Sequence, residues 1–176
     1  FLTVNYAYNN RYLVTATVRQ DNTSRFSKAN ADAIFPSASF GWVLSDEDFY
    51  SSDNYMKLRV SYGTLGNQSL GRTAPDQNIS NLSEANAYYP FDGLSISTGA
   101  ALSAVGNPDL QWETVVSANV GLDFRLMDNK LYGSVDYFNI TTNDLIAVDE
   151  SLIGTTAIDA SAPLVNIGQV SNTGIE

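Results

Sequence analysis

The sequence predicts an all-β chain, and more specifically a segment of an antiparallel transmembrane β-barrel with about six strands. Three observations lead to this prediction. Long stretches alternate apolar and polar residues with a period of two, which is the pattern of a strand with two different faces. Charged residues gather on the polar face of the longest stretches. The connections between the stretches alternate between short and long.

The longest alternating stretch is residues 111–126. Trp112, Val120 and Phe124 fall on one face, while Glu113 and Asp123 fall on the other. Sixteen residues at about 3.3 Å each give roughly 50 Å of strand, whereas an average strand has about five or six residues. In order along the chain, the six predicted strands are residues 1–8, 11–19, 33–44, 55–65, 111–126 and 130–140.

The first four predicted strands are regular, and the last is not. Their apolar faces are, in order, Leu2, Val4, Tyr6 and Tyr8; Tyr12, Val14, Ala16 and Val18; Ile34, Pro36, Ala38, Phe40, Trp42 and Leu44; and Met56, Leu58, Val60 and Tyr62. In residues 130–140, Val135 and Tyr137 oppose Asp136, but Phe138 and Ile140 share the polar side. Aromatic residues gather toward the strand ends of the apolar face, as in a membrane-interface girdle.

Short connections occur at Asn9–Asn10 and at residues 127–129, where Asn and Asp tolerate the positive φ of a tight hairpin. In the connection 45–54, Ser45 with Asp48 predicts a short capped helical turn. The long connections are residues 21–32, 66–110 and 143–163. In an antiparallel meander this places every short connection at one end, as in an outer-membrane barrel with short periplasmic turns. The apolar face would then meet lipid and the polar face a wet lumen.

Composition excludes several function classes. The chain of 176 residues has no Cys and no His, and its net charge is −10. An acidic surface repels nucleic-acid phosphates, so we expect no nucleic-acid partner. Without His or a recognisable nucleophile–base pattern we expect no enzyme, and we expect no catalytic residue, metal site or cofactor. The alternative fold is a secreted β-sandwich that binds carbohydrate, because a sandwich also alternates apolar and polar residues.

Five blocks of local sequence resemble the SusC/RagA family of TonB-linked outer-membrane transporters. They are QDNTSRFSKANADAIFPSASFGWVLSDEDF, MKLRVSYGTLGNQ, GNPDLQWETVVSANVGLDF, LYGSVDYFNITTNDLI and NIGQVSNTGIE, and they occur in family order. Asn22 and Leu65 depart from residues that are common in the family. Asn22 tolerates the same left-handed backbone as the Gly that it replaces.

This resemblance implies an outer-membrane nutrient transporter of Gram-negative bacteria. Residues 1–176 would be part of its multi-pass β-barrel domain, from the later half of the barrel, with the plug domain, the N-terminal signal and the C-terminal strand absent. Family members import glycans or peptides. A SusD-like lipoprotein lid covers the barrel, TonB acts through the plug, and outer-membrane lipid surrounds the strands.

Two groups of residues are candidates for contact with a ligand or partner. Tyr88, Tyr89 and Phe91 lie in the long connection, where they would contact substrate or the lid protein, or else pack on the rim of the barrel. The charged residues of the predicted lumen face are Lys57, Arg59, Glu113, Asp123 and Arg125. These charges could line a solute path, or pair with each other or with the plug, because buried charges need partners.

Overall fold

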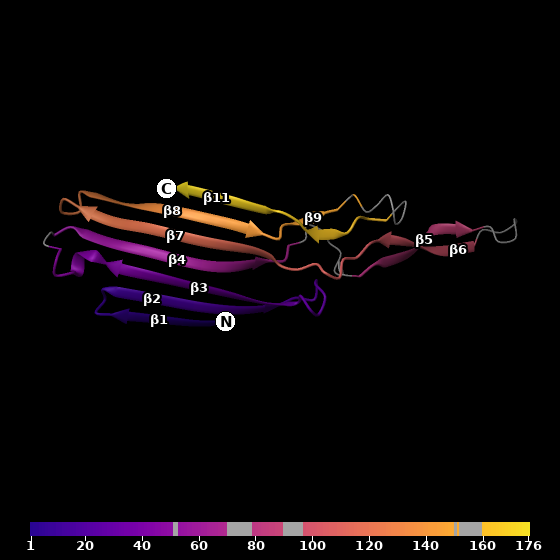
Figure 1. Cartoon of the computed structure of the whole chain (residues 1–176), viewed down its shortest axis with the longest axis horizontal. Helices are drawn as coiled ribbons and strands as arrows, with labels where there is room; N and C mark the ends of the chain where they lie inside the picture. The colour runs from indigo at the N-terminus through magenta and orange to yellow at the C-terminus, as the bar shows by residue number, and fades with distance from the viewer. Residues whose placement is uncertain (51–52, 70–78, 90–96, 150, 152–159) are drawn as a thin grey trace.

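The computed structural model describes residues 1–50, 53–69, 79–89, 97–149, 151 and 160–176. Its main feature is a seven-stranded antiparallel sheet with the strand order β1-β2-β3-β4-β7-β8-β11 (Figure 1). These strands are β1 (Leu2–Tyr8), β2 (Tyr12–Asn22), β3 (Asp32–Val43), β4 (Tyr55–Asn67), β7 (Glu113–Leu126), β8 (Leu131–Asn143) and β11 (Gln169–Ile175). The remaining elements are the hairpin of β5 (Asn81–Tyr89) and β6 (Ser97–Ala104), the pair β9 (Ile146–Val148) and β10 (Leu164–Asn166), and the 3-10 helix η1 (Leu44–Asp46).

The predicted all-β class is confirmed, and each of the six predicted strands is present, as β1 to β4, β7 and β8. The structure adds strands that the alternation did not predict. Strand β11 was missed because its Ser171 and Thr173 take the place of an apolar face. The predicted connection 66–110 contains the β5–β6 hairpin, and the connection 143–163 contains β9.

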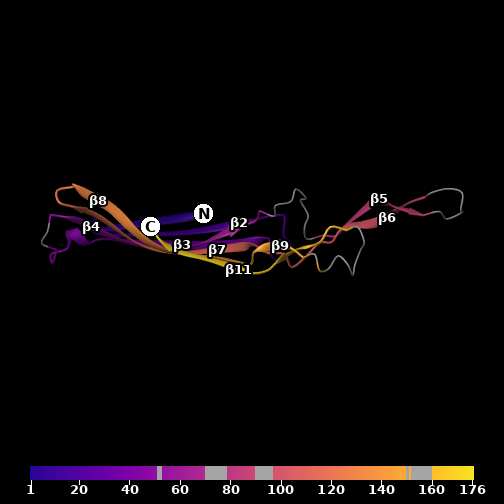
Figure 2. The ribbon, with the colours of Figure 1, turned by 90° about the horizontal axis from the view of Figure 1, so that it is seen from above.

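The sheet forms a single curved layer (Figure 2). The β5–β6 hairpin and the β9–β10 pair lie beyond one end of it, so no second sheet covers either of its faces in the described part of the chain (Figure 1). This arrangement differs from a β-sandwich, in which two sheets pack face to face. No helix among the described residues is both long enough and apolar enough to cross a membrane.

The connections alternate as predicted. The turns from β1 to β2, from β3 to β4 and from β7 to β8 lie at one end of the sheet, and the other connections lie at the opposite end (Figure 1). Asn9 and Asn10 have φ of 50° and 54°, and Asp128 and Asn129 have φ of 54° and 67°. Asn and Asp adopt this left-handed conformation at low cost, which keeps both hairpins tight. We call this end of the sheet the turn end and the opposite end the loop end.

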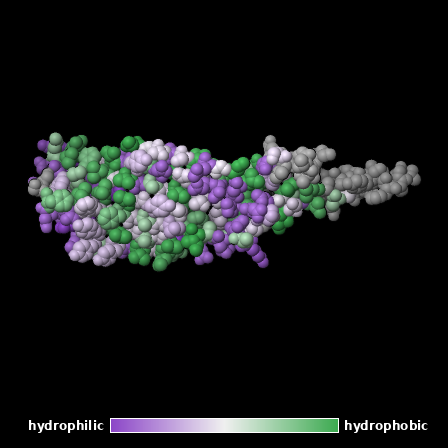
Figure 3. Space-filling view, viewed as in Figure 1, coloured by the Kyte–Doolittle hydropathy of each residue, from purple (hydrophilic) through white to green (hydrophobic). Residues whose placement is uncertain are grey.

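One face of the sheet is apolar and uncovered. A single register row crosses all seven strands of the main sheet with large apolar residues: Tyr6, Val14, Phe40, Val60, Val120, Tyr137 and Ile175. Each of these side chains is at least 38% exposed. Hydrophobic residues lie along the body of the sheet in Figure 3, and hydrophilic residues gather near its loop end. A continuous exposed apolar surface of this kind marks contact with a membrane or a protein.

The buried core lies at the loop end, away from this face. Phe26, Phe35, Leu110, Trp112 and Leu164 form it, and Leu110 is 0% exposed. The Trp112 ring packs edge-on against Phe26 and Phe35 at centroid distances of 5.5 and 5.6 Å. Its indole N–H donates to the carbonyl oxygen of Ala31 at 3.3 Å. The core therefore joins the connection before β3 to the segments before β7 and at β10.

The prediction that Trp112 lies on the apolar face is wrong. Strand β7 begins at Glu113, so the alternation of β7 no longer determines where the Trp112 side chain points. Edge-on packing with two aromatic rings and a hydrogen bond for the indole N–H make the buried position favourable. The helical turn predicted near Ser45 is present as η1, but Val43 occupies its N-cap position and no side chain caps it.

The irregular end of β8 reflects a local exchange of the two faces. Phe138 and Ile140 point to the polar side, opposite Asn119 and Ser117 of β7. Their outward neighbours are polar and pair with β11: Asn139 donates to Thr173 at 3.2 Å, and Thr141 shares a hydrogen bond with Ser171 at 3.2 Å. The apolar face is consequently shorter on β8 and β11 than on β7.

Candidate functional site on the polar face of the sheet

The face opposite the apolar row carries small polar side chains. One residue away from that row, the register aligns Asn5, Thr15, Ser39, Ser61 and Asn119 across five strands. The Thr15 hydroxyl donates to the Asn5 side-chain oxygen at 2.8 Å. These hydroxyl and amide side chains are short, so they lie close to the sheet, and they can donate and accept hydrogen bonds. We call this surface the polar face.

Nearer the turn end, charged side chains of three neighbouring strands form a network of ion pairs on the polar face. Arg59 on β4 donates to both carboxylate oxygens of Asp123 on β7, each at 2.9 Å. Its Nη2 also donates to Asp136 on β8 at 2.9 Å. Of the alternatives predicted for the lumen charges, pairing with each other therefore holds for Arg59 and Asp123, and Asp136 is a further member. A two-pronged Arg–carboxylate contact fixes geometry more firmly than a single hydrogen bond does.

Gly121 makes this network possible. It lies between Arg59 and Asp136 in the register, so the Arg59 side chain must pass over it to reach β8. A Cβ atom at Gly121 would lie 2.3 Å from Asp136 Oδ1 and 2.7 Å from Arg59 Nη2. Because Gly121 has no side chain, the Arg59 guanidinium can lie close to the sheet and reach Asp136.

The remaining predicted charges of this face have different surroundings. Arg125 stacks over the ring of Tyr55, with 5.1 Å from the guanidinium carbon to the ring centroid. Near the loop end, Glu113 accepts a hydrogen bond from the Asn67 amide at 3.1 Å. The Lys57 side chain has no hydrogen bond or ion pair with any residue that the structure describes. Arg125 has no ion pair among these residues either, but its guanidinium rests on the Tyr55 ring, whereas Lys57 has no such ring contact.

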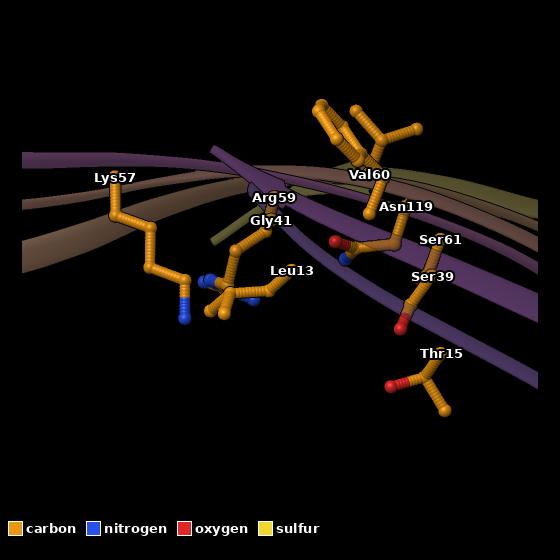
Figure 4. A pocket seen from close by; sticks show the side chains of 10 residues that line it. Leu13, Thr15, Ser39, Gly41, Lys57, Arg59, Val60, Ser61 and Asn119 are labelled. Carbon is orange, nitrogen blue, oxygen red and sulfur yellow. The ribbon is translucent and has the colours of Figure 1, made fainter. Parts of the chain in front are cut away.

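Lys57 borders a shallow depression of about 260 Å³ in the wall. In Figure 4 the Lys57 ammonium and the Thr15 hydroxyl extend to one side of the ribbon, and Val60 extends to the other. Besides Lys57, its polar lining consists of Arg59, Thr15, Ser39, Ser61 and Asn119. The depression thus combines two cationic groups with four neutral hydroxyl or amide groups.

A carboxylate at the turn end holds aromatic side chains of the apolar face. Glu47 accepts hydrogen bonds from the Tyr12 hydroxyl at 2.5 Å and from the Trp42 indole at 2.8 Å, and it pairs with Arg11 at 2.9 Å. The hydrogen bond from Tyr12, followed by that from Trp42 and by the charge of Arg11, lowers the pKa of Glu47. The Tyr12 ring stacks on Tyr8 and Trp42 at centroid distances of 6.3 Å. This cluster corresponds to part of the predicted aromatic girdle.

The predicted aromatic contact residues are only partly described. Tyr88 and Tyr89 end strand β5, where they pair with Thr98 and Ser97 of β6. Phe91 lies outside the described residues. The proposed contact of these three residues with a ligand or lid stays a prediction.

The chemistry of the polar face is that of a binding or conducting wall. No group of three or more Asp or Glu side chains suited to a metal ion occurs among the residues that the structure describes.

Sequence reasoning missed Asp136 and Glu47 as members of clusters. The face of Asp136 followed from alternation, but its partner depended on a register between strands separated by long connections.

Comparison with known proteins gives the family. The model of the family described as "TonB dependent receptor-like, beta-barrel" matches residues 1–176. The chain belongs to this family. In transmembrane barrels generally, an apolar face is the outer surface and a polar face lines the lumen.

Curated relatives agree with this assignment. The chain is 36% identical over 176 residues to TonB-dependent receptor P3 of Formosa agariphila, and 34% identical over 177 residues to TonB-dependent receptor SusC of Bacteroides thetaiotaomicron. Each match covers 98% of this chain and 17% of the relative. The chain therefore spans about a sixth of the length of these relatives.

Solved structures share the fold. The structure of the RagAB peptide transporter superposes with a TM-score of 0.78 and 27% sequence identity, covering 98% of this chain and 18% of that chain. The RagAB peptide importer in its "open-open" state gives 0.77 and 28%. The seven-stranded open sheet thus corresponds to part of a larger barrel, and the alternative of a secreted β-sandwich is not favoured.

Proposed function

We propose that this chain is part of the barrel wall of a TonB-dependent nutrient transporter in the outer membrane of a Gram-negative bacterium. The observation that carries the proposal is the exposed apolar row from Tyr6 to Ile175 on one face of the sheet, together with the small polar side chains on the opposite face. A sheet with an uncovered apolar face and a polar opposite face fits a boundary between lipid and a wet lumen.

The dimensions support a membrane-spanning wall. On β7 the apolar face runs from Val116 to Leu126, which at about 3.3 Å per residue and a tilt of about 40° spans roughly 25 Å of height. This equals the apolar band of about 25 Å that outer-membrane barrels expose. The turn end lies on the periplasmic side and the loop end outside the cell, since barrels of this kind have short periplasmic turns.

The relatives support a proposal for the transported solute and the partners. The full protein imports glycans or peptides, works with a SusD-like lipoprotein lid at the loop end, and contains a plug domain in the lumen through which TonB acts. The name SusC of one relative and the peptide transporter RagAB support this. The β5–β6 hairpin, which extends beyond the loop end in Figure 1, suits contact with the lid or the solute.

A transport experiment tests this function. The gene for the full-length protein is deleted in its host, and growth is measured on individual glycans and on peptides as sole nutrients. Loss of growth on one nutrient class, restored by the full-length gene and not by a version that cannot bind TonB, is the expected result. Growth that is unchanged on every glycan and peptide tested would contradict the proposal.

A further inference from the structure

Of the three cations at this level of the polar face, Arg59 pairs with carboxylates and Arg125 stacks on Tyr55, whereas the Lys57 side chain has neither kind of partner among the described residues. Asp123 lies directly opposite Lys57 in the register of β4 and β7. Both oxygens of that carboxylate already accept hydrogen bonds from Arg59. Asp136 is engaged by the same guanidinium at 2.9 Å. At this level of the wall, three cations including Arg125 therefore face two carboxylates.

The wall beneath Lys57 lets this side chain lie close to the neighbouring strand β3. Gly41 lies beneath it, and a Cβ atom there would come within 3.1 Å of Lys57 Cε. The ammonium borders the depression of about 260 Å³, whose other polar groups include Ser39, Ser61 and Thr15. Figure 4 shows the ammonium and the Thr15 hydroxyl on the same side of the ribbon.

In a closed barrel the ammonium needs a partner. Lys57 is half-buried even in this open sheet. Closure of the barrel and filling of the lumen lower the local dielectric, which strengthens attraction between charges and raises the cost of an unpaired one. Besides Lys57 and Arg59, the polar lining of the depression offers hydroxyl and amide groups but no carboxylate. An incoming anion would therefore be bound by Lys57 and the hydroxyl groups together.

We propose that Lys57 and its depression receive a carboxylate side chain of the plug domain and so hold the plug in the resting transporter. The inference rests on the proposed function, because the plug lies outside these 176 residues. Charge complementarity selects an Asp or Glu side chain, and the proximity of Lys57 to the turn end places the contact in the periplasmic part of the lumen. Breaking such a contact would accompany movement of the plug.

Zero-length cross-linking of the full-length protein tests the contact directly. A carbodiimide joins an amine to a carboxylate only where the two groups touch. We expect an amide bond between the Lys57 amine and an Asp or Glu of the plug, located by mass spectrometry of peptides. Lys57→Arg should lose this product and keep the fold, while Lys130, which is exposed in the turn between β7 and β8, should give no plug product. A Lys57 product with Asp123 alone, or no Lys57 product, would overturn the proposal.

Release of the plug provides a second readout. We expect Lys57→Gln to speed proteolysis of the plug in the folded transporter by about fivefold, as for loss of one partly exposed ion pair. High salt should reduce the difference between the variant and the wild type, and Lys130→Gln should behave as the wild type. A free anionic solute as the natural occupant would leave plug proteolysis unchanged in Lys57→Gln, and this result would refute the plug contact.

The two proposals fail in different ways. Heat-modifiable migration on a gel reports whether the full-length protein forms a barrel at all. A protein without such migration would count against the proposed transporter. A folded barrel in which Lys57→Gln changes neither cross-linking nor plug proteolysis would count against the plug contact alone.

Discussion

A charge placed in the centre of the apolar row should prevent assembly of the barrel. Val120 is 44% exposed and lies between Val60 and Tyr137 in the register, so its outward neighbours on both sides are apolar. It also lies near the middle of the apolar run of β7, from Val116 to Leu126. At this depth an Arg side chain costs about 2–4 kcal/mol, which corresponds to roughly 30-fold to 1000-fold in the folding equilibrium.

The matched control lies three residues earlier on the same strand. Ser117 is exposed on the polar face, opposite Gly63 and Ile140. Ser117→Arg places the same side chain in a wet lumen and should assemble. The assay is heat-modifiable migration of the full-length protein, supported by its abundance in the outer membrane. Equal assembly of Val120→Arg and Ser117→Arg would refute the assignment of the two faces.

Three further variants test individual contacts. Gly121→Ala should cost about 1–3 kcal/mol in a urea titration of the folded barrel, because the new methyl group displaces Arg59 from Asp136; an unchanged midpoint would contradict the close approach. Glu47 has a lowered pKa when folded, so its stabilising contribution is present above its ordinary pKa of about 4.3 and is lost as the pH falls through the lower folded value. The urea midpoint of Glu47→Gln should therefore change less between pH 6 and pH 3 than that of the wild type. Identical dependence of the two midpoints on pH would contradict this role. Trp112→Ala should destabilise the loop-end core by about 3–5 kcal/mol and expose it to protease while heat-modifiable migration persists; resistance equal to the wild type would show that the core does not depend on this ring.

The strands of the main sheet could largely be predicted from alternation, because a strand with lipid on one side and water on the other must alternate. The tight turns were also predictable, since Asn10 and Asp128 belong to residue types that accept the left-handed backbone. Strand β11 could not be found in this way, because Ser171 and Thr173 on its outer face pair with polar residues of β8 and leave no apolar signal.

The clusters of side chains required tertiary information. Alternation assigns Arg59 and Asp136 to the polar face, but only the register between β4, β7 and β8 brings them within 2.9 Å of each other. No property of the sequence fixes that register, because the connection between β4 and β7 is long. Trp112 was misassigned for a related reason: a regular pattern continued past the point at which the strand begins. The role of Glu47 could not be predicted, since its partners Tyr12 and Trp42 lie on strands β2 and β3 while Glu47 lies in the connection that follows η1.

Labelling of single cysteines on intact cells tests the account most directly, because it reports which end of the sheet lies outside the cell. The chain itself has no cysteine, so Leu82→Cys in β5 and Lys130→Cys in the β7–β8 turn can be introduced singly, with any cysteine elsewhere in the full-length protein replaced by Ser. Both positions are exposed. With a thiol reagent that cannot cross the outer membrane, we expect labelling of Leu82→Cys on intact cells and of Lys130→Cys only after permeabilisation. Equal labelling of Lys130→Cys on intact cells would contradict a membrane-spanning wall with its short turns in the periplasm.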